Sequence, residues 1–115
     1  MARVLVVDDD PHIRELVGHF LRMEGLEVVE AVDGLDAMRI FDQIKVDLLV
    51  LDIMMPGING IEVLKIIKQK WPDLKVIIHS GVASKEEQDQ TLTLGATAFL
   101  SKPYKVEKLL EVLDQ

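Results

Sequence analysis

Cysteine is absent from the 115-residue sequence, which excludes disulfides, thiolate metal sites, iron–sulfur clusters and cysteine nucleophiles. Histidine is scarce: three residues, at positions 12, 19 and 79, show no ligand spacing, so a histidine metal site is not expected. No apolar run approaches the roughly 20 residues of a membrane span, and the first residues do not form a signal peptide. We therefore expect a soluble, cytoplasmic protein without membrane partners.

The charge balance is acidic. Thirteen Lys and Arg residues against twenty Asp and Glu residues give a net charge of −7, which disfavours direct contact with nucleic acid phosphates or an anionic membrane. No linker, repeat or low-complexity segment divides the chain. With 49% hydrophobic and 29% charged residues, the length predicts a single domain over residues 1–115.

Short aliphatic runs alternate with stretches of helical periodicity. The strong runs, rich in Val, Ile and Leu, are typical of parallel strands buried on both faces. Strands are predicted at 4–7, 48–51 and 76–78, with weaker ones at 28–29 and 98–100. Helices are predicted at 11–23, 35–44, 60–70, 84–94 and 105–115. This alternation predicts an α/β fold: one doubly wound, five-stranded parallel sheet with five helices on both faces, in the common order 2-1-3-4-5.

Two helices carry start signals. Asp10 before Pro11 predicts an N-cap, a structural role that accounts for this aspartate. Ser84 with Glu87 forms a predicted capping box. The helix that follows Ser84 offers only Leu92 and Leu94 as sizeable apolar anchors, so it should be the most loosely held.

Aspartate residues follow the first and the third predicted strand, which are neighbours in this strand order. Asp8 and Asp9 follow the first strand, and Asp52 ends the third. Adjacent strands lie about 4.8 Å apart, so the side chains should meet at the carboxyl edge of the sheet. Unit charges about 4 Å apart repel by roughly 4 kcal/mol at an effective dielectric of 20, so positive charge is expected there.

Two groups can supply that positive charge. One is Mg²⁺, which takes oxygen ligands from a few carboxylates and a phosphate. The other is Lys102, which follows the fifth strand at the same edge, where Ser80 ends the fourth. A carboxylate can act as the nucleophile toward phosphorus, with metal and lysine sharing the transferred charge. The constellation therefore indicates phosphoryl chemistry.

Four short motifs occur in a fixed order along the chain: Val-Val-Asp8-Asp9-Asp10-Pro11, Asp52-Ile-Met-Met-Pro56-Gly57, Ser80-Gly81 and Ser101-Lys102-Pro103. In order and spacing they resemble the receiver domains of bacterial two-component response regulators, of the chemotaxis type with a flavodoxin-like fold, along essentially the whole chain. The resemblance implies that Asp52 accepts a phosphoryl group from a sensor histidine kinase or phosphotransfer protein. It also implies a Mg²⁺ site formed by Asp8, Asp9, Asp52 and the backbone carbonyl of Met54, with Asp8 acting through the water shell of the metal.

The same resemblance assigns a switch. Lys102 would pair with the phosphoryl group, Ser80 would be the switch hydroxyl, and Phe99 would be the rotating aromatic residue. Phosphorylation would then alter the surface of the fourth helix, fifth strand and fifth helix, which would control a downstream effector or an output domain outside this sequence. The sequence leaves open a dimer formed on phosphorylation. His79 departs from the aliphatic residue expected beside Ser80, and the resemblance gives it no role.

Two other functions share part of this pattern. Asp8 and Asp10 form the Asp-x-Asp pattern of haloacid-dehalogenase-like phosphohydrolases, in which Asp8 would be the nucleophile. His12 stands where that pattern has Thr or Val, and the chain is short for a substrate-covering cap. A receiver-like interaction domain without phosphorylation is disfavoured because the constellation is complete. We therefore expect a phosphoacceptor domain that catalyses only its own phosphorylation and dephosphorylation.

Overall fold

The computed structural model describes residues 2–54, 59–81, 84–102 and 106–113. The described strands are β1 (Arg3–Val7), β2 (Glu27–Ala31), β3 (Leu48–Asp52), β4 (Lys75–Ser80) and β5 (Ala98–Ser101). The described helices are α1 (Pro11–Met23), α2 (Gly34–Phe41), α3 (Gly60–Lys70), α4 (Lys85–Thr93) and α5 (Val106–Leu113). No helix among the described residues has the length and apolar character needed to cross a bilayer.

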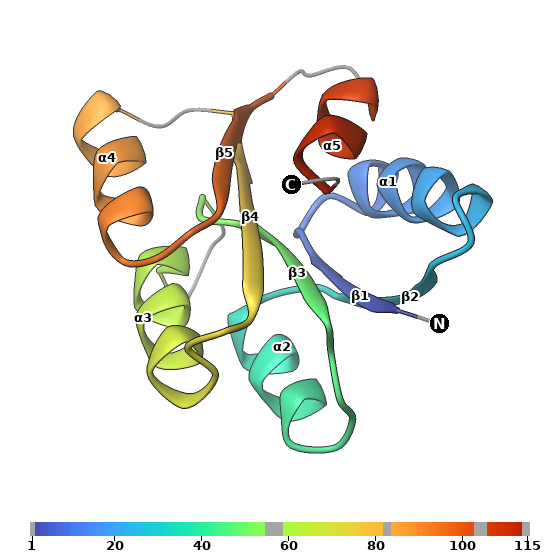
Figure 1. The fold of residues 1–115 in the computed structure, drawn as a ribbon, viewed down its shortest axis with the longest axis horizontal. Coiled ribbons are helices and arrows are strands. Elements are labelled where there is room, and N and C mark those ends of the chain that lie inside the picture. The colour runs from blue at the N-terminus through green and yellow to red at the C-terminus, as the bar shows by residue number, and fades with distance from the viewer. Residues whose placement is uncertain (1, 55–58, 82–83, 103–105, 114–115) are drawn as a thin grey trace.

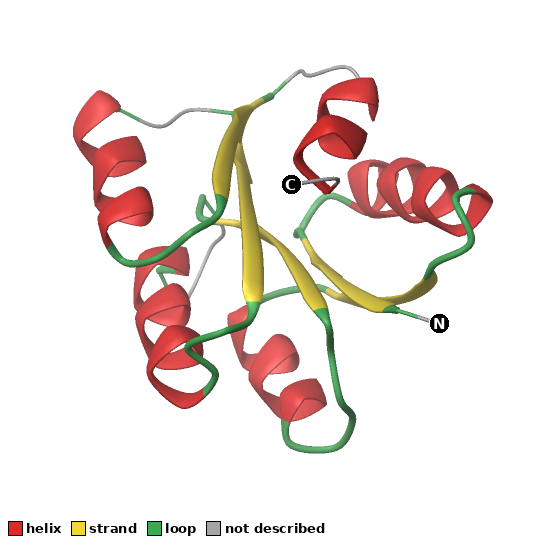
Figure 2. Ribbon diagram, viewed as in Figure 1, coloured by secondary structure: helices red, strands yellow, loops and turns green. Residues whose placement is uncertain are grey.

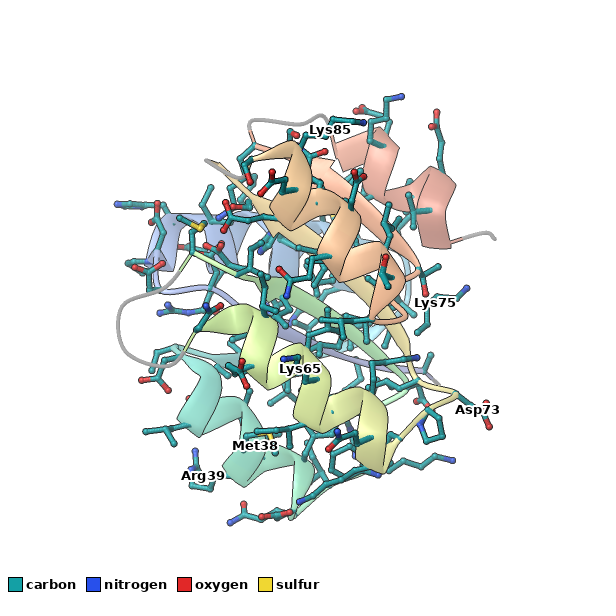
Figure 3. The ribbon with its side chains drawn as sticks, turned by 90° about the vertical axis from the view of Figure 1, so that its left-hand side faces the viewer. Met38, Arg39, Lys65, Asp73, Lys75 and Lys85 are labelled. Carbon is teal, nitrogen blue, oxygen red and sulfur yellow. The ribbon has the colours of Figure 1, made fainter. Side chains whose placement is uncertain are left out.

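The strands form one parallel sheet in the order β2-β1-β3-β4-β5. Helices α1 and α5 cover one face, and α2, α3 and α4 cover the other (Figures 1 and 2). Figure 3 looks onto the second face, where the three helices lie side by side. The predicted fold class and strand order are confirmed.

Alternate residues of the central strands pack into two separate hydrophobic cores, one on each face of the sheet. Val4 and Val6 of β1 pack with α1 and α5, whereas Leu5 and Val7 pack with α2 and α3. The residues from Leu48 to Leu51 are all buried and divide in the same way. A strand covered on both faces needs apolar residues at consecutive positions, which explains why the predicted runs are uninterrupted.

The helix boundaries follow the predicted signals, with two corrections. Asp10 accepts a hydrogen bond from the His12 amide at 2.9 Å, and Ser84 forms the predicted capping box with Glu87. Helix α2, however, ends at Phe41 rather than at position 44. Leu92 was expected to anchor α4 but is 46% exposed, and the buried side chain of this helix is Thr91, whose hydroxyl donates to the Gln88 carbonyl.

The strand register brings the chemically important residues to one edge of the sheet. Val7 pairs with Leu51, which places Asp8 beside Asp52. Asp52 in turn pairs with His79 across β3 and β4. Because parallel strands end at the same edge, residues distant in the sequence meet beyond these carboxyl ends.

Candidate functional site

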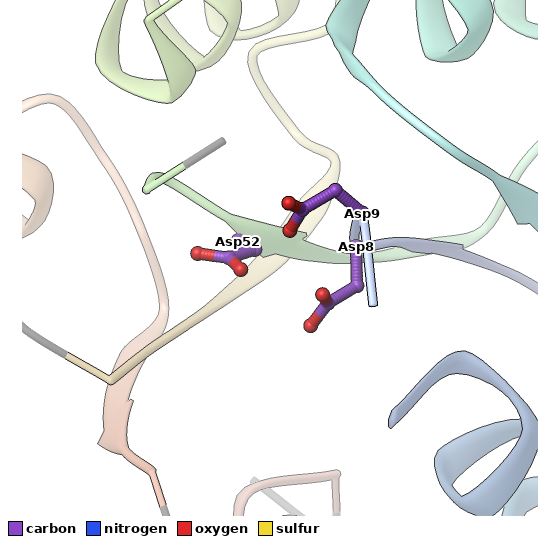
Figure 4. Close-up of side chains that lie close together, drawn as sticks. All are labelled: Asp8, Asp9 and Asp52. Carbon is purple, nitrogen blue, oxygen red and sulfur yellow. The ribbon is translucent and has the colours of Figure 1, made fainter. Parts of the chain in front are cut away.

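Three carboxylates gather at the carboxyl ends of β1 and β3. One oxygen from each of Asp8, Asp9 and Asp52 lies within 4.8 Å of the others, and Figure 4 shows the side chains side by side at these strand ends. Asp8 and Asp52 are buried, at 0% and 4% exposure, whereas Asp9 is exposed. The carboxylates therefore meet as the sequence predicts, and two of them are buried while the third is open to solvent.

Asp8 is held by its backbone as well as by its carboxylate. Its amide donates to the Ala31 carbonyl at 3.2 Å, and its Oδ1 accepts the Asp10 amide at 2.9 Å. Arg14 Nη1 donates to the Asp8 carbonyl at 2.7 Å, and its Nε lies 3.5 Å from Glu30 Oε1. This role of Arg14 was not predicted, because a single arginine on a helix carries no signal of such a contact.

Asp52 is positioned by the turn that follows it. The Met54 amide donates to Asp52 Oδ1 at 2.8 Å. A Cβ on Gly60, the first residue of α3, would stand 2.3 Å from the Ile53 Cα and 2.9 Å from the Asp52 carbonyl oxygen. Only a residue without a side chain allows α3 to begin this close to the end of β3.

Lys102 joins the two buried carboxylates. Its Nζ donates to Asp8 Oδ2 at 2.5 Å and to Asp52 Oδ2 at 3.0 Å, while its backbone amide donates to the Ser80 carbonyl at 2.8 Å. Partial burial opposes the charged form, yet the hydrogen bonds to Asp8 and Asp52 outweigh it and raise the pKa of Lys102 above its ordinary value. The lysine is therefore held as an ammonium between the carboxylates.

Asp8 is kept ionised despite its burial. Desolvation alone would raise its pKa, but the contacts with His79 and Lys102 and the Asp10 amide together hold the pKa of Asp8 well below the usual carboxyl range. His79 is fully buried, and its Nε2 lies 3.2 Å from Asp8 Oδ2. A lone histidine near the end of an aliphatic strand was the available sequence signal for this contact, and no role was assigned to it.

The remaining predicted site residues surround this centre. Ser80 ends β4, is 1% exposed, and its Oγ has no hydrogen-bond partner among the described residues. Phe99 lies on β5 and packs, partly buried, against the core beneath α2 and α3. Met54 follows β3 and is 47% exposed. The role of its backbone carbonyl toward a metal stays a prediction, and Pro56, Gly57 and Pro103 of the motifs lie outside the described residues.

The donor set fits a hard divalent cation. The three carboxylates carry one charge each, and Lys102 compensates for the buried pair only in part. The carboxylate of Asp9 has no hydrogen-bond or ion-pair partner among the described residues, so one oxygen donor group faces solvent without compensation. Oxygen donors of this kind suit Mg²⁺, which keeps several waters and uses few protein ligands.

Comparison with known proteins gives the same family throughout. The response regulator receiver domain model matches residues 4–114. The chemotaxis protein CheY of Listeria monocytogenes is 34% identical over 116 residues, covering 100% of this chain and 98% of CheY. Several other curated relatives are longer: the matched region covers 46% of one transcriptional regulator and 49% of one response regulator. The chain thus spans about half the length of these relatives.

Solved structures agree with the fold. CheY4 of Vibrio cholerae has a TM-score of 0.92 and 33% identity, covering 99% of this chain and 97% of that one. The response regulator TrrA of Thermotoga maritima, solved in complex with Mg²⁺-BeF, has a TM-score of 0.89 and 38% identity, with 99% and 97% coverage. With its sheet order, its acidic cluster and matches over nearly its whole length, the chain belongs to the response regulator receiver domain family of two-component signalling.

Proposed function

We propose that this receiver domain is a Mg²⁺-dependent phosphoacceptor in which Asp52 carries the phosphoryl group. The observation that supports the proposal best is the position of Lys102 Nζ, 2.5 Å from Asp8 Oδ2 and 3.0 Å from Asp52 Oδ2. One cation thus lies where negative charge would grow if Asp52 were modified. Asp9 adds a carboxylate on the open side of the cluster.

The reaction is a transfer of a phosphoryl group between two nucleophiles. A carboxylate oxygen of Asp52 attacks phosphorus, and the bond from phosphorus to the donor imidazole nitrogen breaks, with the electron pair leaving on nitrogen. The product is an acyl phosphate on Asp52. In dephosphorylation a water oxygen attacks phosphorus and the bond to Asp52 breaks, which restores the carboxylate and releases inorganic phosphate, while the water proton that phosphate does not keep passes to solvent.

Protein groups supply position and charge for this transfer. The Met54 amide orients Asp52 by donating to Oδ1, and Lys102 neutralises charge beside Oδ2. Asp8, Asp9, Asp52 and the Met54 carbonyl would hold Mg²⁺, directly or through water. When bound, Mg²⁺ neutralises charge on the transferred group. The Mg²⁺-BeF complex of TrrA supports this assignment by similarity.

The modified state differs from the unmodified one by a dianion beside Ser80. The buried Ser80 Oγ lacks a partner among the described residues and can donate to a phosphoryl oxygen. This new hydrogen bond would displace the end of β4. The displacement would act on α4, which has one buried residue among those described, and on Phe99 of the neighbouring β5. The altered α4, β5 and α5 surface would control an effector or output domain, and a second copy is a further candidate partner.

The proposed function also includes the phosphoryl donor and the connection of this domain to an output. A cytoplasmic histidine kinase or phosphotransfer protein would donate the phosphoryl group to Asp52, and the domain would catalyse only its own phosphorylation and dephosphorylation. The short CheY relative supports a freestanding regulator, whereas the longer relatives support a receiver joined to an output domain. This domain itself would make no nucleic acid contact, in keeping with its net charge of −7.

A labelling experiment tests the proposal against the hydrolase alternative. The protein is incubated with acetyl phosphate, with and without Mg²⁺, and the intact mass is followed in the original chain, in Asp52→Asn and in Asp8→Asn. We expect one Mg²⁺-dependent, base-labile phosphoryl adduct that is absent from Asp52→Asn. An adduct that persists in Asp52→Asn and is lost in Asp8→Asn would instead identify Asp8 as the nucleophile of a phosphohydrolase.

A further inference from the structure

His79 is a buried imidazole in a position fixed by the sheet. It is 0% exposed and lies on β4, where it pairs with Asp52 of β3 on one side and with Leu100 of β5 on the other. Burying polar nitrogens costs about 1 to 3 kcal/mol unless they are compensated. The preceding residues of this strand, Val76, Ile77 and Ile78, are aliphatic and buried, so the imidazole is a costly exception.

Asp8 Oδ2 is the described acceptor beside this imidazole. His79 Nε2 lies 3.2 Å from Asp8 Oδ2, and Lys102 Nζ lies 2.5 Å from the same oxygen. Nε2 faces this oxygen without completing a hydrogen bond in the unmodified state, and a proton on Nε2 would make it a donor there. Asp8 Oδ2 thus accepts from Lys102 and has His79 Nε2 beside it, and the other oxygen, Oδ1, accepts the Asp10 amide.

The two donors differ in their freedom to move. His79 is held by strand pairs on both sides, whereas the Lys102 side chain is 17% exposed and already reaches Asp52 Oδ2 at 3.0 Å. When the charge on Asp52 grows, Lys102 is drawn toward it and its contact with Asp8 weakens. A buried carboxylate that lost its partner would resist this movement, because an unpaired buried charge is strongly unfavourable.

We infer that His79 is a positioning residue that keeps Asp8 Oδ2 paired while Lys102 transfers its contact to the phosphoryl group on Asp52. The inference rests on the proposed function and adds a residue to its mechanism. No covalent bond changes at His79, which lowers the cost of moving Lys102 by donating to Asp8 Oδ2 once Lys102 moves away. Groups that hold a metal-ligating side chain in place, as His79 would hold Asp8, typically contribute about 10-fold to 100-fold in metal affinity or activity.

The test compares two replacements of His79. His79→Leu has a similar volume and no donor, whereas His79→Gln places an amide N–H near the position of Nε2. Phosphorylation is followed at saturating Mg²⁺ and constant pH while acetyl phosphate is varied. We expect the maximal rate constant to fall about tenfold in His79→Leu, with the half-saturating donor concentration unchanged, and His79→Gln to recover most of the rate.

The controls separate this role from a structural one. His19→Leu removes an exposed histidine of α1 and should keep the original rate. If His79→Leu does not fold, His79→Met, which also lacks a donor, replaces it. Combining His79→Leu with Asp8→Asn should add little to the effect of Asp8→Asn alone, because His79 acts through Asp8.

Two results would overturn the inference while leaving the proposed function intact: a rate unchanged in His79→Leu, or equal losses in the leucine and glutamine variants. Equal losses would mean that the ring fills space rather than donates. An original chain that takes no phosphoryl group at Asp52 would defeat the proposed function itself, and the inference with it.

Discussion

Lys102 and Asp8 are 94 positions apart in the sequence, yet Lys102 Nζ lies 2.5 Å from Asp8 Oδ2. The contact joins the segment after β5 to the segment after β1, on strands that are not neighbours in the sheet. The Lys102 backbone amide donates to the Ser80 carbonyl at the end of β4, and the side chain reaches past Asp52 at the end of β3 to its partner. This arrangement makes the site dependent on the whole fold.

Replacing Lys102 should destabilise the protein in the absence of metal. Lys102→Met keeps most of the side-chain volume but leaves Asp8 and Asp52 without the shared ammonium. Breaking a buried ion pair by removing one partner costs about 3 kcal/mol or more, which urea unfolding would measure. Lys108→Met provides a control, because the ion pair of Lys108 with Glu111 is exposed. A loss below about 0.5 kcal/mol for Lys102→Met would show that the buried pair is not structurally important.

Mg²⁺ should stabilise the protein through Asp9. At about ten times its Kd, a ligand specific for the folded state adds about 1.4 kcal/mol, or roughly 5 °C in Tm for a domain of this size. Asp9→Asn should raise the Tm without metal, by relieving repulsion from Asp8 and Asp52, and should abolish the Mg²⁺ response. Asp10→Asn is the matched control, since asparagine also caps a helix. Calorimetric scans with equal Mg²⁺ shifts in both variants would contradict the metal assignment.

The pH dependence of stability should change when Asp8 is replaced. The folded-state pKa of Asp8 is depressed below its ordinary value of 3.8, so its ionisation stabilises the fold fully above that pH. The contribution is lost as the pH falls further toward the folded-state pKa. Metal-free Asp8→Asn should therefore lose stability less steeply below about pH 4. Denaturant titrations from pH 6 to pH 2 would measure the slopes, and parallel slopes would refute the effect.

Stability at alkaline pH tests the contribution of Lys102, the partner of Asp8. The pKa of Lys102 is raised above 10.5 in the folded state, so its charge stabilises the protein fully below that value. This contribution is lost as the pH rises through the folded-state pKa. The Lys102→Met variant should therefore show a flatter decline in stability above pH 10.5 than the original chain.

Gly60 should tolerate no side chain, because α3 begins against the end of β3. The Cβ of Gly60→Ala would meet the Ile53 backbone at 2.3 Å, which should cost about 1 to 3 kcal/mol, displace Asp52 and weaken Mg²⁺ binding. Gly18→Ala, whose nearest contact would be the Arg22 guanidinium at 3.4 Å, is the control. Urea unfolding and Mg²⁺ titration of both variants measure the difference, and equal behaviour would refute the close approach.

The sequence predicted the fold because periodicity and topology point to the same answer. Uninterrupted apolar runs such as the one from Leu48 to Leu51 require cover on both sides, and five alternating units restrict the strand order. Strand order alone then brings Asp8, Asp9 and Asp52 together, as the structure confirms. The placement of Lys102 and Ser80 at the same edge was predicted on the same grounds.

What the sequence could not predict depends on side-chain direction and on packing that has no local pattern. His79 Nε2 lies 3.2 Å from Asp8 Oδ2, but nothing in the sequence distinguishes this histidine from a buried histidine that contacts other groups. Leu92 fits the helical spacing of an anchor yet is exposed, because α4 rests on the sheet through Thr91. The contact of Arg14 with the Asp8 carbonyl depends on how α1 is oriented about its own axis, which hydrophobic periodicity does not determine closely enough.

The central claim is that Asp52 is the residue that carries the phosphoryl group. Sodium borohydride reduces the acyl phosphate of an aspartate to homoserine, so treatment after incubation with Mg²⁺ and acetyl phosphate marks the modified position permanently. Peptide mass spectrometry then locates it. We expect homoserine at position 52, in Mg²⁺-containing samples alone. Homoserine at position 8 or 9, with Asp52 recovered unchanged, would contradict the account.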